Sequence, residues 1–174
     1  MLTNKEKKQF LMIALSCLRK KGEARPIFSP DVPTKDELDS IREGLKNGNI
    51  GEDLLKKFFP IAYKGVLKHG IMKYFFLIHN KMIMNLDRYT KTNLVEWCRA
   101  YPSKIIGKKN SKWVVERIDG KKIISDTNIY PGLKLNDKDL RIGSLVILHR
   151  GKIHMVLNEK QYKEAVEFFN LLKS

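Results

Sequence analysis

The sequence predicts an α+β protein in two parts: a mainly helical domain of unknown role over residues 1–92, and a small OB-like β-barrel with a C-terminal helix over residues 93–174. Three patterns support this. Helix-start signals fill the first half, short apolar runs between turn residues fill the second, and an amphipathic stretch closes the chain. A length of 174 residues suits one domain or two small ones, and 43% hydrophobic residues suffice for a core.

Local capping chemistry predicts the helices of the first half. Thr3 with Glu6 and Thr34 with Glu37 have the spacing of capping boxes, in which each partner satisfies a free backbone N–H at a helix start. Prolines between residues 22 and 33 interrupt the pattern. We expect helices at about 3–21, 34–47, 52–59 and 61–69.

The next segment is ambiguous. The run Tyr74–Ile78 is continuously apolar, which a buried strand or a buried helix would equally produce. Residues 79–81 could turn the chain, so we expect a hairpin that returns through Met82–Met84. The polar stretch Asp87–Asn93 is the best candidate linker between the two domains.

Short runs separated by glycine, asparagine and aspartate predict the β-rich half. Five strands in so short a stretch suit a small barrel, which closes its edges on itself. After Asn158, a plausible N-cap, apolar residues recur at helical spacing and predict a terminal helix on the barrel. The expected strands are 103–106, 112–118, 121–125, 145–148 and 152–156, with turns at 107, 119–120, 131–132, 136–137 and 150–151.

Composition excludes several classes of protein. Two cysteines, Cys17 and Cys98, cannot form a disulfide framework, and two free thiols fit the reducing cytoplasm. With four scattered histidines they do not suggest a structural zinc site. The longest apolar run, Phe10–Leu18, is too short to span a membrane. We find no carboxylate pair, nucleophile with a base or phosphate loop, so we expect no enzyme activity.

The net charge of +15 invites a nucleic-acid interpretation, because clustered Lys and Arg release counterions from phosphates. The excess is spread along the chain, as on an ordinary solvated lysine-rich surface. A basic OB-type module is therefore the alternative function, with Tyr101, Trp113 and Tyr130 available for base stacking.

Two segments of the second half contain side chains that could bind a ligand or a metal. Cys98 precedes an extended X-Pro segment at Pro102, where we expect an exposed thiol, and Arg99 and Lys104 would favour its thiolate form. Residues 142–153 read as a strand that ends in His149 beside a glycine turn. A thiolate and an imidazole on separate strands could together hold a ligand or a soft metal fragment.

These two segments resemble the HypC/HupF family of nickel–iron hydrogenase maturation chaperones. The family begins Met-Cys-x-(Ala or Gly)-x-Pro-x-(Lys or Arg)-(Ile or Val). It later carries Val-Gly-Asp-Tyr-Val-x-Val-His-x-Gly, followed by Leu-(Asp or Asn)-Glu at the start of a final helix. The first signature is matched by Cys98, Ala100, Pro102, Lys104 and Ile105. The second is matched by Gly143, Val146, His149, Gly151, Leu157, Asn158 and Glu159. The resemblance covers about residues 97–174; Ser144 replaces the aspartate, and Cys98 is internal.

The resemblance implies an accessory chaperone. Its barrel would carry, through Cys98, an iron fragment bearing cyanide and carbon monoxide from the HypD scaffold to the large subunit of a metalloenzyme. Cys98 would be the iron ligand and the contact for partners, and His149 would assist it. No other cofactor is implied. The N-terminal helices could instead make the protein a docking scaffold.

Each candidate residue also has a purely structural interpretation. Cys98 could be a small buried residue, and His149 could end a strand and bond a backbone carbonyl. Gly143 and Gly151 read as turn residues that need positive φ. Three further histidines are expected at the surface or in turns: His69, His79 and His154.

Overall fold

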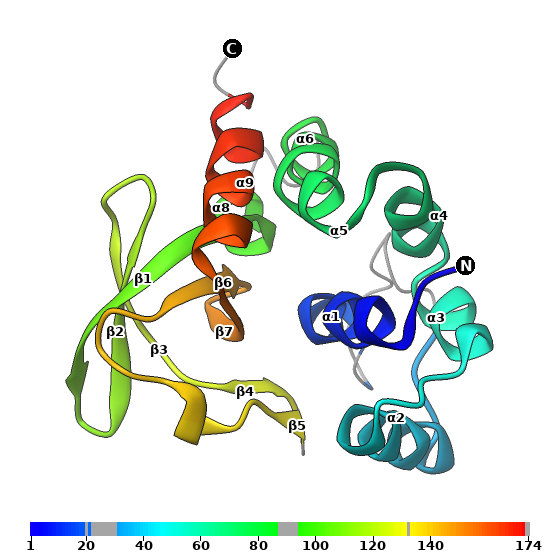
Figure 1. Cartoon of the computed structure of the whole chain (residues 1–174). Coiled ribbons are helices and arrows are strands. Elements are labelled where there is room, and N and C mark those ends of the chain that lie inside the picture. The colour runs from blue at the N-terminus through cyan, green and yellow to red at the C-terminus, as the bar shows by residue number, and fades with distance from the viewer. Residues whose placement is uncertain (20, 22–30, 87–93, 132, 173–174) are drawn as a thin grey trace. The chain divides into compact units, whose positions relative to one another are not determined.

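Helices make up the first unit of the structure, and helices with an antiparallel sheet make up the second (Figure 1). The computed structural model describes residues 1–19, 21, 31–86, 94–131 and 133–172. Its contacts divide the chain into one unit over residues 1–71 and another over residues 72–174. The α+β prediction is confirmed at this level. No helix in the described ranges is long and apolar enough to cross a membrane.

The capping boxes of the first unit are confirmed. Thr3 and Thr34 each accept a hydrogen bond from the backbone N–H of the glutamate three residues on, and that glutamate accepts one in return. The first helix is shorter than predicted, because it tightens into a 3-10 turn after Ala14. Phe10 packs edge-on against the rings of Phe59 and Tyr63. The elements are α1 (Asn4–Ala14), η1 (Leu15–Cys17), α2 (Lys35–Asn47), α3 (Glu52–Phe58) and α4 (Pro60–His69).

The predicted hairpin at residues 74–84 is wrong. This segment is helical: α5 (Ile71–Lys73) leads into the π-helical segment η2 (Tyr74–His79) and then α6 (Asn80–Met84). Its apolar run is a buried helical segment, with Tyr74, Phe75 and Phe76 almost fully enclosed. Wider π-helical turns bury His79 as well, although we expected it in a turn.

Five strands form the main sheet in the order β3-β2-β1-β6-β7, and every neighbouring pair is antiparallel. The C-terminal helix begins after Asn158, whose side chain forms the predicted cap, and contacts β1, β6 and β7 (Figure 1). Its Phe169 enters the core of the sheet beside Tyr101. The elements are α8 (Leu94–Cys98), β1 (Ala100–Lys109), β2 (Lys112–Arg117), β3 (Lys122–Ser125), β4 (Asn128–Tyr130), β5 (Leu133–Lys134), η3 (Asp137–Asp139), β6 (Leu145–His149), β7 (Lys152–Leu157) and α9 (Glu159–Asn170).

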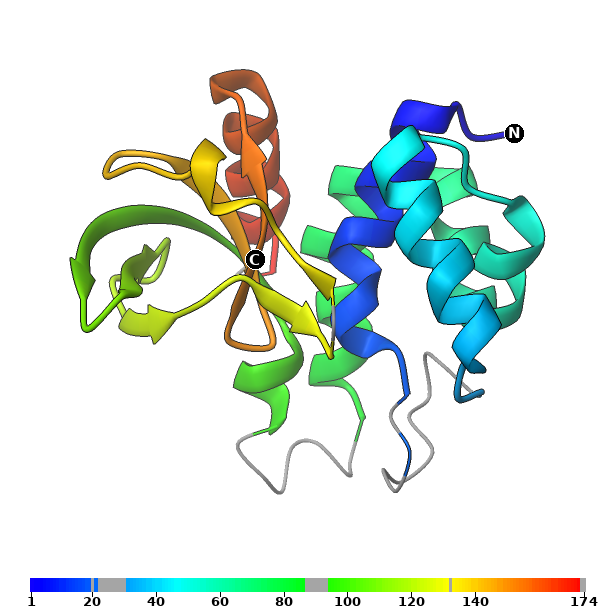
Figure 2. The same ribbon diagram turned by 90° about the horizontal axis from the view of Figure 1, so that it is seen from below.

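Strand β1 is long and bent, as Figure 2 shows. Its first half pairs with β6, its second half pairs with β2, and the register with β2 shifts between Ile105 and Gly107. The predicted turn at Gly107 is therefore wrong, because this glycine lies in a bulge inside the strand. A bulge increases local twist and lets one strand serve two neighbours in different directions.

The sheet is mostly antiparallel, and the pairs among its described strands leave it open between β3 and β7. An isolated parallel bridge joins Asp126, just after β3, to Lys152 at the start of β7. The short pair β4 and β5 was not predicted from the sequence. The boundary that we predicted between residues 92 and 93 stays a prediction, because residues 87–93 lie outside the described part of the chain.

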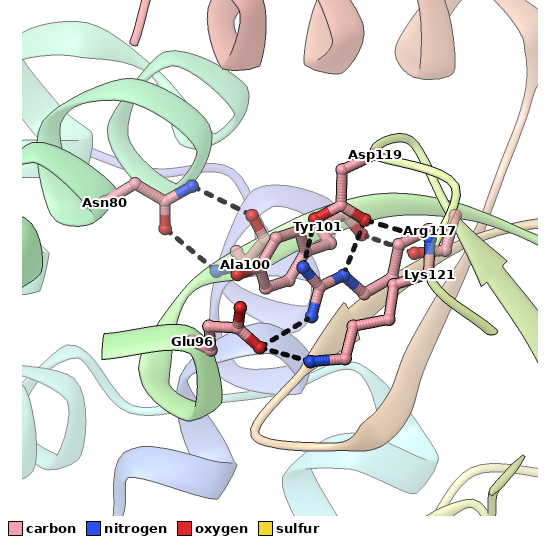
Figure 3. Close-up of polar contacts among 8 residues, drawn as sticks. Asn80, Glu96, Ala100, Tyr101, Arg117, Asp119 and Lys121 are labelled. Carbon is pink, nitrogen blue, oxygen red and sulfur yellow. Dashed lines mark hydrogen bonds and ion pairs between the residues drawn. The ribbon is translucent and has the colours of Figure 1, made fainter. Parts of the chain in front are cut away.

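An asparagine side chain replaces a strand at the start of β1. Ala100 lies opposite His149 of β6, whereas β2 pairs with β1 only from Ser103 onward. The backbone N–H of Ala100 donates to Asn80 Oδ1 at 2.8 Å, and its carbonyl accepts from Asn80 Nδ2 at 2.8 Å (Figure 3). Asn80 is fully buried and also donates to the carbonyl of Phe76. Its amide therefore fastens the helical segment to the first residue of the sheet.

Replacing this amide tests its role. Asn80→Ala leaves the N–H and C=O of Ala100 buried without partners, and it should lower the free energy of unfolding by about 3 kcal/mol. Both tryptophans, Trp97 and Trp113, lie in the second unit, so urea unfolding followed by tryptophan fluorescence reports on that unit. The control is Asn170→Ala at the exposed end of α9, which should change little. Equal effects of the two substitutions would contradict this role.

Candidate functional site

Strand pairing brings the two family-like segments together. Ala100 lies opposite His149, and Pro102 lies opposite Ile147. At the other end of the pair, Gly143, which has a φ of 93°, donates its N–H to the carbonyl of Ile105 at 2.8 Å. All residues that carry the resemblance up to Gly151 therefore lie along the β1–β6 pair or at its ends.

Cys98 ends α8 and is buried, with 8% of the residue exposed. The expectation of an exposed thiol is therefore wrong. Pro102 lies inside β1, which begins three residues before the predicted strand 103–106, and it is also buried. Lys104 points to solvent, and the guanidinium of Arg99 lies over the rings of Tyr101 and Phe169 at 5.3 and 5.0 Å from their centroids.

His149 is fully buried and lies beside the backbone of Cys98. Its Nε2 is 3.0 Å from the Cys98 carbonyl oxygen, which makes the ring nitrogen the donor of this bond. The imidazole that the sequence placed next to the cysteine is thus adjacent to it. The bond to a backbone carbonyl is also the structural role that we considered for His149.

Two histidines that we expected at the surface belong to the same buried group. The ring centroid of His149 lies 5.3 Å from that of His79 and 5.4 Å from that of His154. His154 Nε2 lies 3.1 Å from the carbonyl oxygen of His149. A bulge in the β6–β7 pair breaks the alternation of β7, so neighbouring Ile153 and His154 are both buried.

Two of these histidines lie close enough to bind one metal ion, but Cys98 does not join them. Ring nitrogens of His79 and His149 lie within 4.8 Å of each other, close enough for one metal ion to bridge them. Within the described residues, Cys98 belongs to no group of three His, Cys, Asp or Glu side chains whose ligand atoms are this close. Cys98 and His149 are therefore neighbours through the backbone of Cys98 rather than preset ligands of one ion.

Trp97 covers the turn between β6 and β7. Arg150 and Gly151 have φ values of 50° and 71°, as a tight hairpin requires. A Cβ atom on Gly151 would lie 2.5 Å from the indole ring of Trp97, so only glycine permits this contact. The indole rests on the turn that follows His149, and the next residue along the chain is Cys98.

A charged network lies beside Tyr101 (Figure 3). Arg117, with a side chain only 4% exposed, forms a two-pronged pair with Asp119, and its guanidinium lies 3.7 Å from the ring centroid of Tyr101. Lys121 Nζ donates to Glu96 Oε2 at 2.5 Å, and Arg117 lies 3.7 Å from the same carboxylate oxygen. The network ties α8 to β2 and to the turn after it.

Burial and pairing act in opposite directions on these ionisable groups. Burial is the largest single effect on Asp119 and would raise its pKa, but the hydrogen bond and the charge of Arg117, together with backbone hydrogen bonds, hold the pKa below its usual value. Burial raises the pKa of Tyr101, so its hydroxyl stays protonated at neutral pH. The hydrogen bond from Lys121 lowers the pKa of Glu96, which keeps this carboxylate charged. The network therefore stays ionised around a neutral phenol.

No family model, curated protein or solved structure matches this chain.

The contact between Trp97 and Gly151 can be tested with a matched pair of glycines. Gly151→Ala should displace the indole and α8, so we expect Cys98 to react with a thiol reagent at least about tenfold faster. Gly120→Ala is the control, because Gly120 has a similar positive φ of 84° but an added Cβ there meets nothing within 4 Å. Peptide mapping by mass spectrometry assigns the modified cysteine. Equal rates in both variants would show that Trp97 does not shield Cys98.

Proposed function

We propose that this protein is an accessory protein of the HypC/HupF type, without catalytic activity of its own, that handles a soft iron fragment through Cys98. The observation that carries the proposal is the pairing of Ala100 with His149, which sets the imidazole 3.0 Å from the carbonyl of Cys98. Two sequence signatures separated by about 40 residues thereby become one structural element.

The strand arrangement supports an OB-like barrel for residues 93–174. If the bridge between Asp126 and Lys152 is counted as a closing contact, the strands follow the cyclic order β1-β2-β3-β7-β6 and return to β1. The bridge is parallel, whereas all strand pairs of the main sheet are antiparallel. The Nζ of Lys152 reinforces the bridge by donating to both carboxylate oxygens of Asp126 at 2.9 Å. The bend in β1 gives the curvature that such closure needs.

In this proposal the thiolate of Cys98 is the ligand of the fragment. Low-spin iron bearing carbonyl and cyanide is soft and prefers sulfur to a carboxylate. The imidazole of His149 orients the backbone on which the thiol stands. Burial of Cys98 means that loading requires displacement of α8, so the fragment is shielded from solvent between transfers. The partners are a HypD-like scaffold and the large subunit of a metalloenzyme in the cytoplasm.

Co-expression tests this proposal. The full chain, produced with a HypD-like scaffold and a hydrogenase large-subunit precursor, should be isolated with iron and with infrared bands of bound cyanide and carbon monoxide. Cys98→Ser should lose both. His149→Gln should reduce iron content severalfold, whereas His69→Gln, at a half-buried position in the first unit, should not. A metal-free protein that captures neither partner and behaves as Cys98→Ser does would refute the proposal.

A nucleic-acid-binding module is the second candidate, and a specific surface favours it. The end of the β1–β2 hairpin carries exposed lysines, and the ammonium of Lys108 lies 4.9 Å from the ring centroid of Trp113. Loops at this position bind oligonucleotides in OB-folds. These exposed lysines are Lys108, Lys109 and Lys112.

Salt dependence decides this second candidate. Single-stranded RNA or DNA should bind at low salt, and its affinity should fall as the salt concentration rises. The double variant Lys108→Ala/Lys109→Ala should bind it several-fold more weakly. The control replaces Lys160 and Lys163 on α9, which removes the same charge elsewhere. Absence of fluorescence anisotropy change at low salt would exclude the candidate.

A further inference from the structure

A cleft of about 350 Å³ lies between α8, strands β1 and β2 and the β6–β7 turn, within the second unit. Its size lies at the lower end of the range for small-molecule sites. Its apolar lining consists of Trp97, Ile123 and Leu148; Trp97 as a residue remains 47% exposed although its indole rests on Gly151. The charged part of the lining is called the cationic wall below.

The cationic wall carries one positive charge in excess. Arg99, Arg117 and Lys121 line the cleft with the carboxylate of Glu96. Asp119 neutralises Arg117 through a two-pronged pair, and Glu96 is bonded to Lys121. Because these two pairs cancel, the uncompensated charge is that of Arg99. A single excess charge favours a monoanion over a multiply charged phosphate.

Two buried polar groups at the cleft lack hydrogen bonds. The hydroxyl of Tyr101 and the Nε–H of Arg99 are shielded from solvent, and neither has a partner among the described residues. Tyr101 itself is only 2% exposed. Buried polar groups in native proteins are almost always satisfied, so such a pair in a cleft indicates an absent partner. Both groups are donors, because the phenol stays protonated, and an acceptor would satisfy them.

We propose that this cleft binds a carboxylate attached to an apolar body, with the carboxylate held by Arg99 and Tyr101 and the body against Trp97 and Leu148. A carboxylate offers several acceptor positions to two donors at once, and a bond to a guanidinium is charge-assisted. Binding includes a rotation of the Arg99 side chain, which is half-buried over the Tyr101 ring, and this rotation uncovers the hydroxyl. The site does not use the thiol of Cys98.

The carboxylate of Glu96 competes with the ligand's carboxylate for the cations of the cleft, and this competition gives a specific test. It holds Lys121 and lies 3.7 Å from Arg117. Removing its charge frees both cations for the incoming anion. Glu96→Gln should therefore bind the ligand several-fold more tightly, which is the opposite of what a generally damaged site would do.

Titration of the full chain with benzoate, followed by tryptophan fluorescence and by NMR shifts of the Trp97 indole, tests the site. We expect saturable binding in the millimolar range and binding of neutral benzamide about tenfold weaker. Arg99→Gln should weaken benzoate binding about tenfold. Tyr101→Phe should weaken it several-fold without lowering the melting temperature, because the hydroxyl has no partner in the unliganded protein. Arg42→Gln, in the first unit, is the matched control and should bind as the wild type does.

The source of the carboxylate is distinguished by a second pair of probes. The probes are N-acetyl-glycyl-phenylalanine, which has a peptide C-terminus, and its amide, which is the neutral counterpart. If this acid binds more tightly than benzoate, the natural ligand is a polypeptide C-terminus. If benzoate binds more tightly, the natural ligand is a small acid. Absence of saturable binding by either acid would overturn the proposal, as would unchanged binding in Arg99→Gln. Cys98→Ser should bind benzoate normally, so failure of the iron proposal leaves this one intact.

Discussion

The geometry of the second unit depends on one side-chain amide. Asn80 occupies the side of β1 where β2 has already ended, and its two hydrogen bonds to Ala100 substitute for those of a neighbouring strand. A primary amide can do this because it carries a donor and an acceptor at the spacing of a peptide group. Without it, the first residue of the sheet would bury two unsatisfied backbone groups.

The positions of Cys98, His149 and Trp97 follow from this fixed start of β1. Once Ala100 is held opposite His149, the preceding Cys98 carbonyl meets the imidazole, and Trp97 reaches the turn at Gly151. The following residue, Tyr101, then faces the core with Arg117 over its ring. Residues 97–101 thus contribute both to the cleft, through Trp97, Arg99 and Tyr101, and to the contact with the buried imidazole of His149, through the carbonyl of Cys98.

Local chemistry explains which parts of the fold were predictable. The capping boxes at Thr3 and Thr34 and the cap at Asn158 involve residues three positions apart, so the sequence alone contains both partners. The pairing of the Cys98 segment with the His149 strand could be anticipated because both carry recognisable signatures. The run at Tyr74–Ile78 is apolar on every side, and such a run does not distinguish a strand from a buried helix. The burial of His154 depends on a bulge, and the role of Asn80 depends on a partner 20 residues away, so neither has a local signal.

Native-state hydrogen exchange at the backbone amide of Ala100 tests the central interaction most directly. If Asn80 Oδ1 accepts this hydrogen in a fully buried bond, the amide should exchange only through global unfolding of the second unit, as slowly as the amides at the centre of β1. Exchange as fast as that of the amide of Asn110, in the exposed turn between β1 and β2, would show that no such bond persists in solution. The start of β1 would then be free to move, and the positions assigned to Cys98, His149 and the cleft would lose their common support.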